Sequence, residues 1–461
     1  MPRPPHRPGS PSRSAAPRPA ADVAGLPARR LAGEVFAAVT EQRQALDDTL
    51  DRILASPPGR ALEDRDRGLV RAIATTAVRR FGTIRRVLLD RMTSGLPDEG
   101  GPLPQVLATA VAQLLFMDVP DHAAVDLAIR LLLEDKHGQR YTKLANGVLR
   151  RVGRERDAIL AALDPLALDT PAWLRRRWTA AYGEDAARRL AAAHMSEAAL
   201  DLTFKTPDIR DRRAAELGGL VLPTGSLRLA DRAPLPSLPG YQEGDWWVQD
   251  AAAALPARLL GVGAGDKVAD LCAAPGGKTA QLAAAGAAVT AVDRSAARLE
   301  RLKTNMARLG LSVEVEAVDA TAMAGDGLYD AVLLDAPCSA TGTLRRHPDV
   351  AWTKDDQDVF RLAALQTRLL AKAVDLVRVG GRVVYCTCSL EPEEGEAQIR
   401  GLLARDDRVE RRPVDPSEIG GLEGAITAEG DLRTLPFMLP DADPRFSGLD
   451  GFFAARLVRV R

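Results

Sequence analysis

The sequence has few cysteines, few aromatic residues, no net charge and no long apolar run. Its four cysteines, all in the C-terminal half of the 461 residues, have spacings that fit neither a disulfide framework nor a zinc site with paired cysteines. Lysine plus arginine number 62, as do aspartate plus glutamate, so a surface for a polyanion has to be a local patch. No stretch approaches the roughly 18 apolar residues of a membrane helix, and no apolar segment follows the basic N-terminus as in a secretory signal. These absences predict a cytoplasmic protein without a metal ion.

What is present indicates a multidomain protein, because 461 residues exceed one ordinary domain and 46% of them are hydrophobic. Residues 1–28 are rich in proline, arginine and serine, and we expect a disordered basic tail. Over 29–163, apolar residues such as Val35, Phe36 and Val39 recur at three- and four-residue steps, which predicts an all-α domain of five or more helices. Its arginines form either ordinary polar helix faces or, if clustered, a patch for the RNA backbone: Arg79, Arg80, Arg85, Arg86, Arg150 and Arg151.

Residues 164–250 are predicted to form a small α+β connector module. Within it, 200–205 and 225–229 have the composition of short strands. The pair Trp246 and Trp247 stands at the entrance to the next domain. Two adjacent indole rings either stack on a base or pack in a core, and the sequence leaves both interpretations open.

The C-terminal domain, 251–461, is organised around a glycine-bearing loop, D-L-C-A-A-P-G-G-K-T at 270–279. A short apolar strand over 267–272 precedes the loop and a helix follows it, which is the first unit of a doubly wound, Rossmann-like α/β sheet. Gly276 and Gly277 remove side chains where the backbone has to pass close to a ligand. The amides that open the helix then face a small anion such as a carboxylate.

The next two predicted strands each end in an aspartate. Asp293 follows 287–292 and can accept hydrogen bonds from both hydroxyls of a ribose, whereas Asp319 follows 313–318 and can accept one from an adenine amino group. Each acid alone could be only a helix N-cap, but the repetition favours an adenosyl ligand. The sequence has no phosphate-binding glycine motif, so the expected cofactor is an adenosyl compound without phosphates, S-adenosylmethionine (SAM).

Two further strands lead into loops that carry cysteines. The strand over 329–334 enters D-A-P-C, which ends at Cys338, and the strand over 381–386 delivers Cys386 and Cys388. Free cysteines are usually small buried hydrophobes. At strand ends beside a methyl donor, however, a thiolate is a usable nucleophile.

Three motifs resemble the signatures of one family. D-L-C-A-A-P-G-G-K-T, D-A-P-C-S-A-T-G with R-R-H-P-D, and T-C-S-L-E-P-E-E are similar to the motifs of the Fmu/Sun family of RNA cytosine-5 methyltransferases. The helical region, notably N-G-V-L-R-R at 146–151, resembles the NusB-type RNA-binding domain. The resemblance covers 29–461 and implies a SAM-dependent RNA (cytosine-5)-methyltransferase, which we expect to be a monomer. Its implied substrate is small-subunit (16S) rRNA, free or in an early ribosomal particle.

The resemblance also implies roles for individual residues. Cys388 is the nucleophile that adds to cytosine C6 and makes C5 electron-rich, and Cys338 assists product release. Asp335, beside the base, stabilises protonation of N3. Two residues depart from the family pattern, because Cys386 is an extra thiol near the nucleophile and Gly395 stands where an asparagine is expected. The implied SAM-binding residues are Cys272, Ala273, Ala274, Pro275, Gly276, Gly277, Lys278, Asp293, Asp319 and Asp335.

The sequence leaves other functions open. A DNA cytosine-5 methyltransferase would use Cys338 as its nucleophile, although the T-C-S loop and the helical domain argue against that class. A non-catalytic RNA-binding assembly factor would need neither cysteine, yet both are kept. The same chemistry on another RNA, such as tRNA, is not distinguished. Arg345 and Arg346 are either phosphate contacts or ordinary surface arginines.

Overall fold

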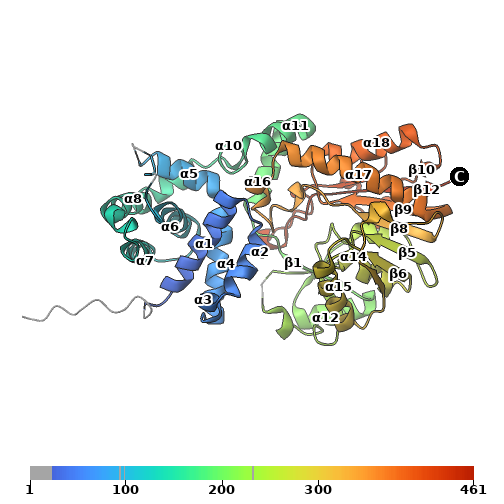
Figure 1. Ribbon diagram of the computed structural model, residues 1–461, viewed down its shortest axis with the longest axis horizontal. Helices are drawn as coiled ribbons and strands as arrows, with labels where there is room; N and C mark the ends of the chain where they lie inside the picture. The colour runs from blue at the N-terminus through green and yellow to red at the C-terminus, as the bar shows by residue number, and fades with distance from the viewer. Residues whose placement is uncertain (1–22, 93–94, 98, 231–232) are drawn as a thin grey trace, which may run out of the picture. The chain divides into compact units, whose positions relative to one another are not determined.

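The protein, in a computed structural model, divides into two compact units (Figure 1). The residues that the structure describes are 23–92, 95–97, 99–230 and 233–461. The first unit takes the chain up to Glu41, Asp48–Ala77 and Ile84–Ala162, and the second takes Gln42–Asp47, Val78–Thr83 and Leu163–Arg461. In the described part of the chain, no helix has the length and apolar character needed to cross a membrane.

The first unit is all-α, as predicted, and α6 is its central helix. Every residue of α6 from Val106 to Leu115 is buried, and α7 and α8 pack against it. Residues 1–22 of the predicted tail lie outside the described residues, and α1 begins at Leu26, so the last three residues of the predicted tail, 26–28, are helical. The helices in this part of the chain are α1 (Leu26–Gln42), α2 (Leu46–Leu54), α3 (Pro57–Arg60), α4 (Asp64–Arg79), α5 (Phe81–Leu89), α6 (Leu103–Phe116), α7 (Asp121–Leu133), α8 (Thr142–Arg154) and α9 (Arg156–Ala161).

The continuous part of the second unit, from Leu163 onward, begins with a small α+β module. Two helices, α10 (Pro165–Leu168) and α11 (Ala172–His194), lead into a four-stranded antiparallel sheet of order β2-β3-β1-β4. The strands β1 and β3 confirm the two that the sequence predicted. The other members of the module, in chain order, are β1 (Leu200–Phe204), α12 (Pro207–Leu217), β2 (Leu220–Val221), β3 (Leu227–Leu229) and β4 (Trp246–Val248).

The tryptophan pair belongs to β4, and the structure decides how each ring is used. Trp246 is fully buried, packs edge-on against Tyr241 and donates its indole N–H to the carbonyl of Pro239 at 2.8 Å. Trp247 is 6% exposed and donates to Oε1 of Gln249, also at 2.8 Å. Packing is therefore the correct interpretation of Trp246.

The large sheet has the order β10-β12-β9-β8-β5-β6-β7, with β11 paired to β12. The strands from β7 to β9 are parallel, which confirms the predicted Rossmann-like fold, whereas β10, β11 and β12 are antiparallel additions that sequence reasoning missed. The strands are β5 (Lys267–Leu271), β6 (Ala288–Val292), β7 (Glu314–Glu316), β8 (Tyr329–Asp335), β9 (Val377–Thr387), β10 (Val409–Arg411), β11 (Leu432–Thr434) and β12 (Phe452–Arg459).

Helices cover both faces of this sheet, because alternate residues of its central strands are apolar on both sides (Figure 1). Ala269 and Leu334 belong to the core under α17 and α18, whereas Val268 and Leu333 belong to the core under α13 and α14. The two layers leave the carboxyl ends of the parallel strands at one edge, where the motif-bearing loops meet. The helices are α13 (Leu255–Leu259), α14 (Gly277–Ala284), α15 (Ala296–Leu309), α16 (Val350–Thr353), α17 (Asp356–Leu376) and α18 (Glu396–Arg405).

Candidate active site

Two cavities at the carboxyl edge of the large sheet collect all ten predicted SAM-binding residues. A small cavity of about 90 Å³ is lined by Cys272, Asp293 and Asp319. A larger one of about 610 Å³ is lined by Ala273 through Lys278, by Asp335 and by Cys388. The side chain of Arg298 lines both cavities, so they adjoin.

The glycine loop turns sharply between β5 and α14. Cys272 has φ 63° and Gly276 has φ 103°, both in the left-handed region, which a residue with a side chain rarely adopts. At Gly276 a Cβ atom would lie 2.9 Å from Cγ of Leu302, so glycine is required there for space as well as for conformation. The loop thereby brings the first amides of α14 to the larger cavity, where they can face an anionic group.

The two strand-end acids have local partners and also line the small cavity. Asp293 is 4% exposed, accepts a hydrogen bond from the Ser295 amide at 2.9 Å and pairs with Nη1 of Arg298 at 3.2 Å. Asp319 caps a short 3₁₀ turn by accepting from the amide and hydroxyl of Thr321, and these hydrogen bonds lower the pKa of its carboxyl group. The cap interpretation and the ligand interpretation of Asp319 are thus compatible.

Lys278 and Asp335 form an ion pair in the larger cavity. Nζ of Lys278 lies 2.7 Å from Oδ2 of Asp335 and 4.8 Å from the centre of the Phe452 ring. Burial disfavours the ammonium ion, but the Asp335 carboxylate and the sulfur atoms of Cys386 and Cys388 outweigh it and raise the pKa of Lys278. Lys278 is therefore a fixed positive charge beside both the acid and the cysteine loop.

The two cysteine loops meet at their sulfur atoms. Sγ of Cys338 lies 3.5 Å from Sγ of Cys388, but only Cys388 is among the residues that line the larger cavity. The hydrogen bond to the Cys388 sulfur, together with burial, raises the pKa of the Cys338 thiol well above its usual range. Cys386 is fully buried and donates to Oδ1 of Asp335 at 3.5 Å; burial and this carboxylate raise the pKa of its thiol as well.

A buried glutamate that sequence reasoning missed ties the two loops together. The Glu394 carboxylate is fully buried and accepts hydrogen bonds from the Ser339 amide at 2.9 Å and from Nε2 of Gln366 at 3.1 Å. Gln366 also donates to the carbonyl of Pro337 at 2.9 Å, and Ser339 contacts Ser389 through their hydroxyls at 3.1 Å. The acidic run E-P-E-E-G-E after the second cysteine loop did not reveal this role, because acids at a helix start are ordinarily stabilised there by the helix dipole while exposed to water.

The two arginines of the R-R-H-P-D motif have different surroundings in the structure. Arg346 lines the larger cavity and pairs with the buried Asp450, so it faces the site. Arg345 is 4% exposed and donates to the backbone carbonyl of Ser447 at 2.8 Å, so it is a structural residue and not a phosphate contact. Trp247 also lines the larger cavity, which keeps a stacking role available to that ring.

A doubly wound sheet with a glycine loop and acids at successive strand ends defines a Rossmann-like domain that binds an adenosyl cofactor. Comparison with known proteins agrees with this class. Residues 257–458 match the model of the 16S rRNA methyltransferase RsmB/F family, and 26–154 match that of the NusB family. The chain is 32% identical to ribosomal RNA small subunit methyltransferase B of Klebsiella pneumoniae over 94% of this chain and 98% of the relative, and the Escherichia coli protein of that name gives the same three values.

The chain therefore belongs to the 16S rRNA methyltransferase RsmB/F family, and it is a SAM-dependent rRNA methyltransferase with a NusB-like N-terminal domain. The fold agrees with a solved structure, that of PH0851, which superposes with a TM-score of 0.73 over 95% of this chain and 99% of that one, at 22% identity. The resemblance drawn from the motifs is thus confirmed, as are the enzyme class and the cofactor.

Proposed function

We propose that the protein methylates C5 of a cytosine in 16S rRNA through a covalent bond between Cys388 and C6 of the base. The observation that carries the proposal is that Cys388 faces the cavity formed by the glycine loop and Asp335, with the Cys338 sulfur 3.5 Å behind it. The names of the relatives, which specify the small ribosomal subunit, support the choice of RNA.

The proposed reaction uses Cys388 because C5 of cytosine is too weak a nucleophile to attack a methyl sulfonium directly. Addition of the Cys388 thiolate to C6 forms a C–S bond and moves electron density to C5, while N3 of the base takes up a proton that Asp335 stabilises. SAM supplies the methyl group, with Asp293 and Asp319 holding its adenosine end. A base then takes the C5 proton, the electrons of that C–H bond re-form the C5–C6 double bond as the Cys388 sulfur leaves C6, and N3 gives up its proton, which restores the aromatic ring. The ammonium of Lys278 fixes the orientation of the Asp335 carboxylate during this sequence.

Cys338 is assigned to the release step. Its raised pKa keeps it as a neutral thiol, which is a poor nucleophile but can donate its proton to the Cys388 sulfur, 3.5 Å away, as that sulfur leaves C6. The DNA-type arrangement, in which Cys338 attacks the base, is disfavoured because Cys338 is not among the residues lining the larger cavity.

The substrate has to present an unstacked base, so we infer a loop or a locally opened helix of 16S rRNA, free or in an early particle. We also infer that the enzyme acts in the cytoplasm and as a monomer. Four free cysteines fit a reducing compartment.

The test is to map 5-methylcytosine in total RNA from cells with and without the protein. We expect one site in 16S rRNA to disappear and to return with the wild-type gene but not with Cys388→Ala. Loss of a 5-methylcytosine site in tRNA instead would show that the substrate is tRNA and not 16S rRNA. An unchanged map would contradict the enzymatic proposal and favour an assembly factor.

A further inference from the structure

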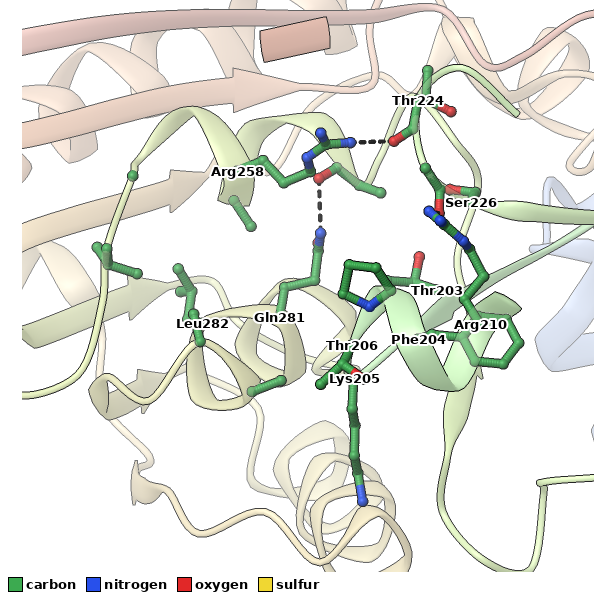
Figure 2. Close-up of a pocket in the computed structure, with 18 residues that line it drawn as sticks. Thr203, Phe204, Lys205, Thr206, Arg210, Thr224, Ser226, Arg258, Gln281 and Leu282 are labelled. Atoms are coloured by element: carbon green, nitrogen blue, oxygen red, sulfur yellow. Dashed lines mark hydrogen bonds between the residues drawn. The ribbon is translucent and has the colours of Figure 1, made fainter. Parts of the chain in front are cut away.

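A third cavity, outside the two that hold the predicted site residues, lies between the small sheet and the helices α13 and α14 (Figure 2). We propose that this Arg210–Arg258 pocket binds one phosphate of the RNA backbone. Its volume is about 400 Å³. The residues lining it that the proposal uses are Thr203, Arg210, Thr224, Gly225, Ser226 and Arg258. The inference rests on the rRNA substrate of the proposed function.

The two guanidinium groups converge on one turn of the chain. Arg258 donates through Nη1 to the carbonyl of Thr224, and Arg210 donates through Nη1 to the carbonyl of Gly225 at 3.2 Å. A Cβ atom on Gly225 would lie 3.2 Å from Nη1 of Arg258 and 3.6 Å from Nη1 of Arg210. The two nitrogens are consequently no more than about 7 Å apart, a span that one phosphate with two hydrogen bonds can bridge.

The pocket has more positive charge than its own carboxylates neutralise. Among the described residues, Arg258 forms no ion pair, and the partner of Arg210 is the exposed Asp211 at 2.7 Å. Burial, and then the charge of Arg210, lower the pKa of Arg258, as expected for a desolvated cation facing a like charge. An anion between the two groups would remove this repulsion.

Other groups in the pocket also suit a phosphate. α12 is 11 residues long and begins at Pro207, so its positive end adds to the field of the arginines. Within the described chain, the buried hydroxyl of Thr203 has no hydrogen-bond partner, and Thr203 and Ser226 line the same pocket as Arg210. Figure 2 shows the Lys205 ammonium extending away from both arginines, so it is not part of the proposed site.

The pocket is one layer of side chains away from the catalytic cavity. Gln249 lines the larger catalytic cavity, Gln281 lines the Arg210–Arg258 pocket, and Nε2 of Gln249 donates to Oε1 of Gln281 at 2.8 Å. An RNA strand whose target base enters the catalytic cavity has neighbouring phosphates within reach of such a site. This proximity favours a backbone phosphate over a free one.

The test measures binding of the full-length protein to a 16S rRNA transcript over a series of KCl concentrations. Arg258→Gln should weaken binding about threefold to tenfold near 0.1 M salt and reduce the slope of log K against log[salt] by about 0.7, the loss of one phosphate contact on a single strand. Arg258→Lys, which keeps the charge, should retain the slope. Arg212→Gln is the matched control, because Arg212 is an exposed arginine of the same α12 and does not line the pocket.

Each outcome decides the proposal. If Arg258→Gln binds RNA with the same affinity and salt slope as Arg212→Gln, and unchanged SAM affinity shows that it is folded, the proposal is wrong. The two arginines then only stabilise the turn. If inorganic phosphate raises the melting temperature of the wild type but not of Arg258→Gln, and RNA binding is unchanged, the pocket binds free phosphate instead. If the wild type forms no 5-methylcytosine but Arg258→Gln still lowers the salt slope of RNA binding, the proposed function is wrong and the phosphate site is supported.

Discussion

The sulfur atoms of Cys338 and Cys388 lie 3.5 Å apart, although the two residues are 50 positions apart in the chain. Their loops follow the adjacent parallel strands β8 and β9, where Asp335 stands opposite Cys386 and the Ala336 amide donates to the Cys386 carbonyl at 2.9 Å. One cysteine lines the cavity and the other lies behind it. This difference in position, together with the raised pKa of the Cys338 thiol, is the basis of their proposed division of labour.

Replacing Cys388 and replacing Cys338 should block different steps of the reaction. Without the Cys388 sulfur, C5 is never activated, so Cys388→Ala should give neither methylated RNA nor a covalent complex. Without Cys338, addition and methyl transfer can proceed but release is slow. Cys338→Ala incubated with RNA and SAM should therefore accumulate a protein–RNA species that survives denaturing electrophoresis.

Cys386 provides the control for this experiment. It is fully buried two residues before the proposed nucleophile, so Cys386→Ala should remain substantially active and lose only a little packing and the weak 3.5 Å hydrogen bond from its sulfur to Asp335. A trapped adduct with Cys388→Ala and none with Cys338→Ala would reverse the two roles. An inactive Cys386→Ala would move the nucleophile to that residue.

SAM affinity should depend on Asp293. A hydrogen-bonded pair of ribose hydroxyls on a charged acceptor is worth a few kcal/mol, so Asp293→Ala should weaken binding about tenfold to a hundredfold in calorimetry. Asp330→Ala is the control, since Asp330 pairs with Arg378 at the opposite end of β8. Equal affinities for the two variants would show that Asp293 does not hold the ribose.

The helical domain should contribute RNA affinity through phosphates. Of the six arginines singled out there, Arg79 is 7% exposed and the Arg80 side chain 19%, whereas Arg150 and Arg151 on α8 are exposed. The double variant Arg150→Gln/Arg151→Gln should weaken rRNA binding and lower its salt slope, because fewer counterions are released. SAM binding should be unaltered.

A matched pair outside the helical domain controls for the loss of two positive charges. Arg361 and Arg378 are exposed arginines of the second unit, with side chains 72% and 55% exposed. If Arg361→Gln/Arg378→Gln lowers the salt slope as much as the α8 variant does, the helical domain has no special share in RNA binding.

Stability should depend on pH through Asp270. Burial raises the pKa of this carboxyl to about 7, and its Oδ2 accepts from the Thr279 hydroxyl at 2.6 Å. Because an unfolded aspartate titrates near pH 4, the folded state alone holds the proton between about pH 4 and 7, and the free energy of unfolding falls as pH rises through that window.

Asp270→Asn removes this titration but keeps an acceptor for Thr279. The difference in melting temperature, variant minus wild type, should therefore increase from about pH 4 to pH 7. The increase should be roughly 2–4 °C for each kcal/mol of stability that the wild type loses over this range. Calorimetric scans without SAM measure it. Parallel profiles for the two proteins would mean that Asp270 titrates normally in the folded state.

Much of the candidate active site was predictable because its residues lie in continuous motifs at the ends of apolar strands. Gly276, Asp293 and Asp319 follow three successive strands, and parallel strands of a doubly wound sheet end at one edge. The antiparallel strands β10 to β12 were missed because β12 pairs with β9, and β10 and β11 pair with β12, between segments that no local pattern connects. Glu394 was missed because its acceptor role depends on Ser339 and Gln366, both distant in the chain.

The sequence by itself determined the fold class, the cofactor and the family, because local periodicity and short motifs carry that information. Only the tertiary structure decided which groups are exposed. It buried Trp246 and Arg345, aimed Cys388 rather than Cys338 at the cavity, and brought Arg210 and Arg258 together on one turn. The physical reason is that burial and charge pairing depend on every neighbour of a side chain, and most of those neighbours come from other parts of the chain.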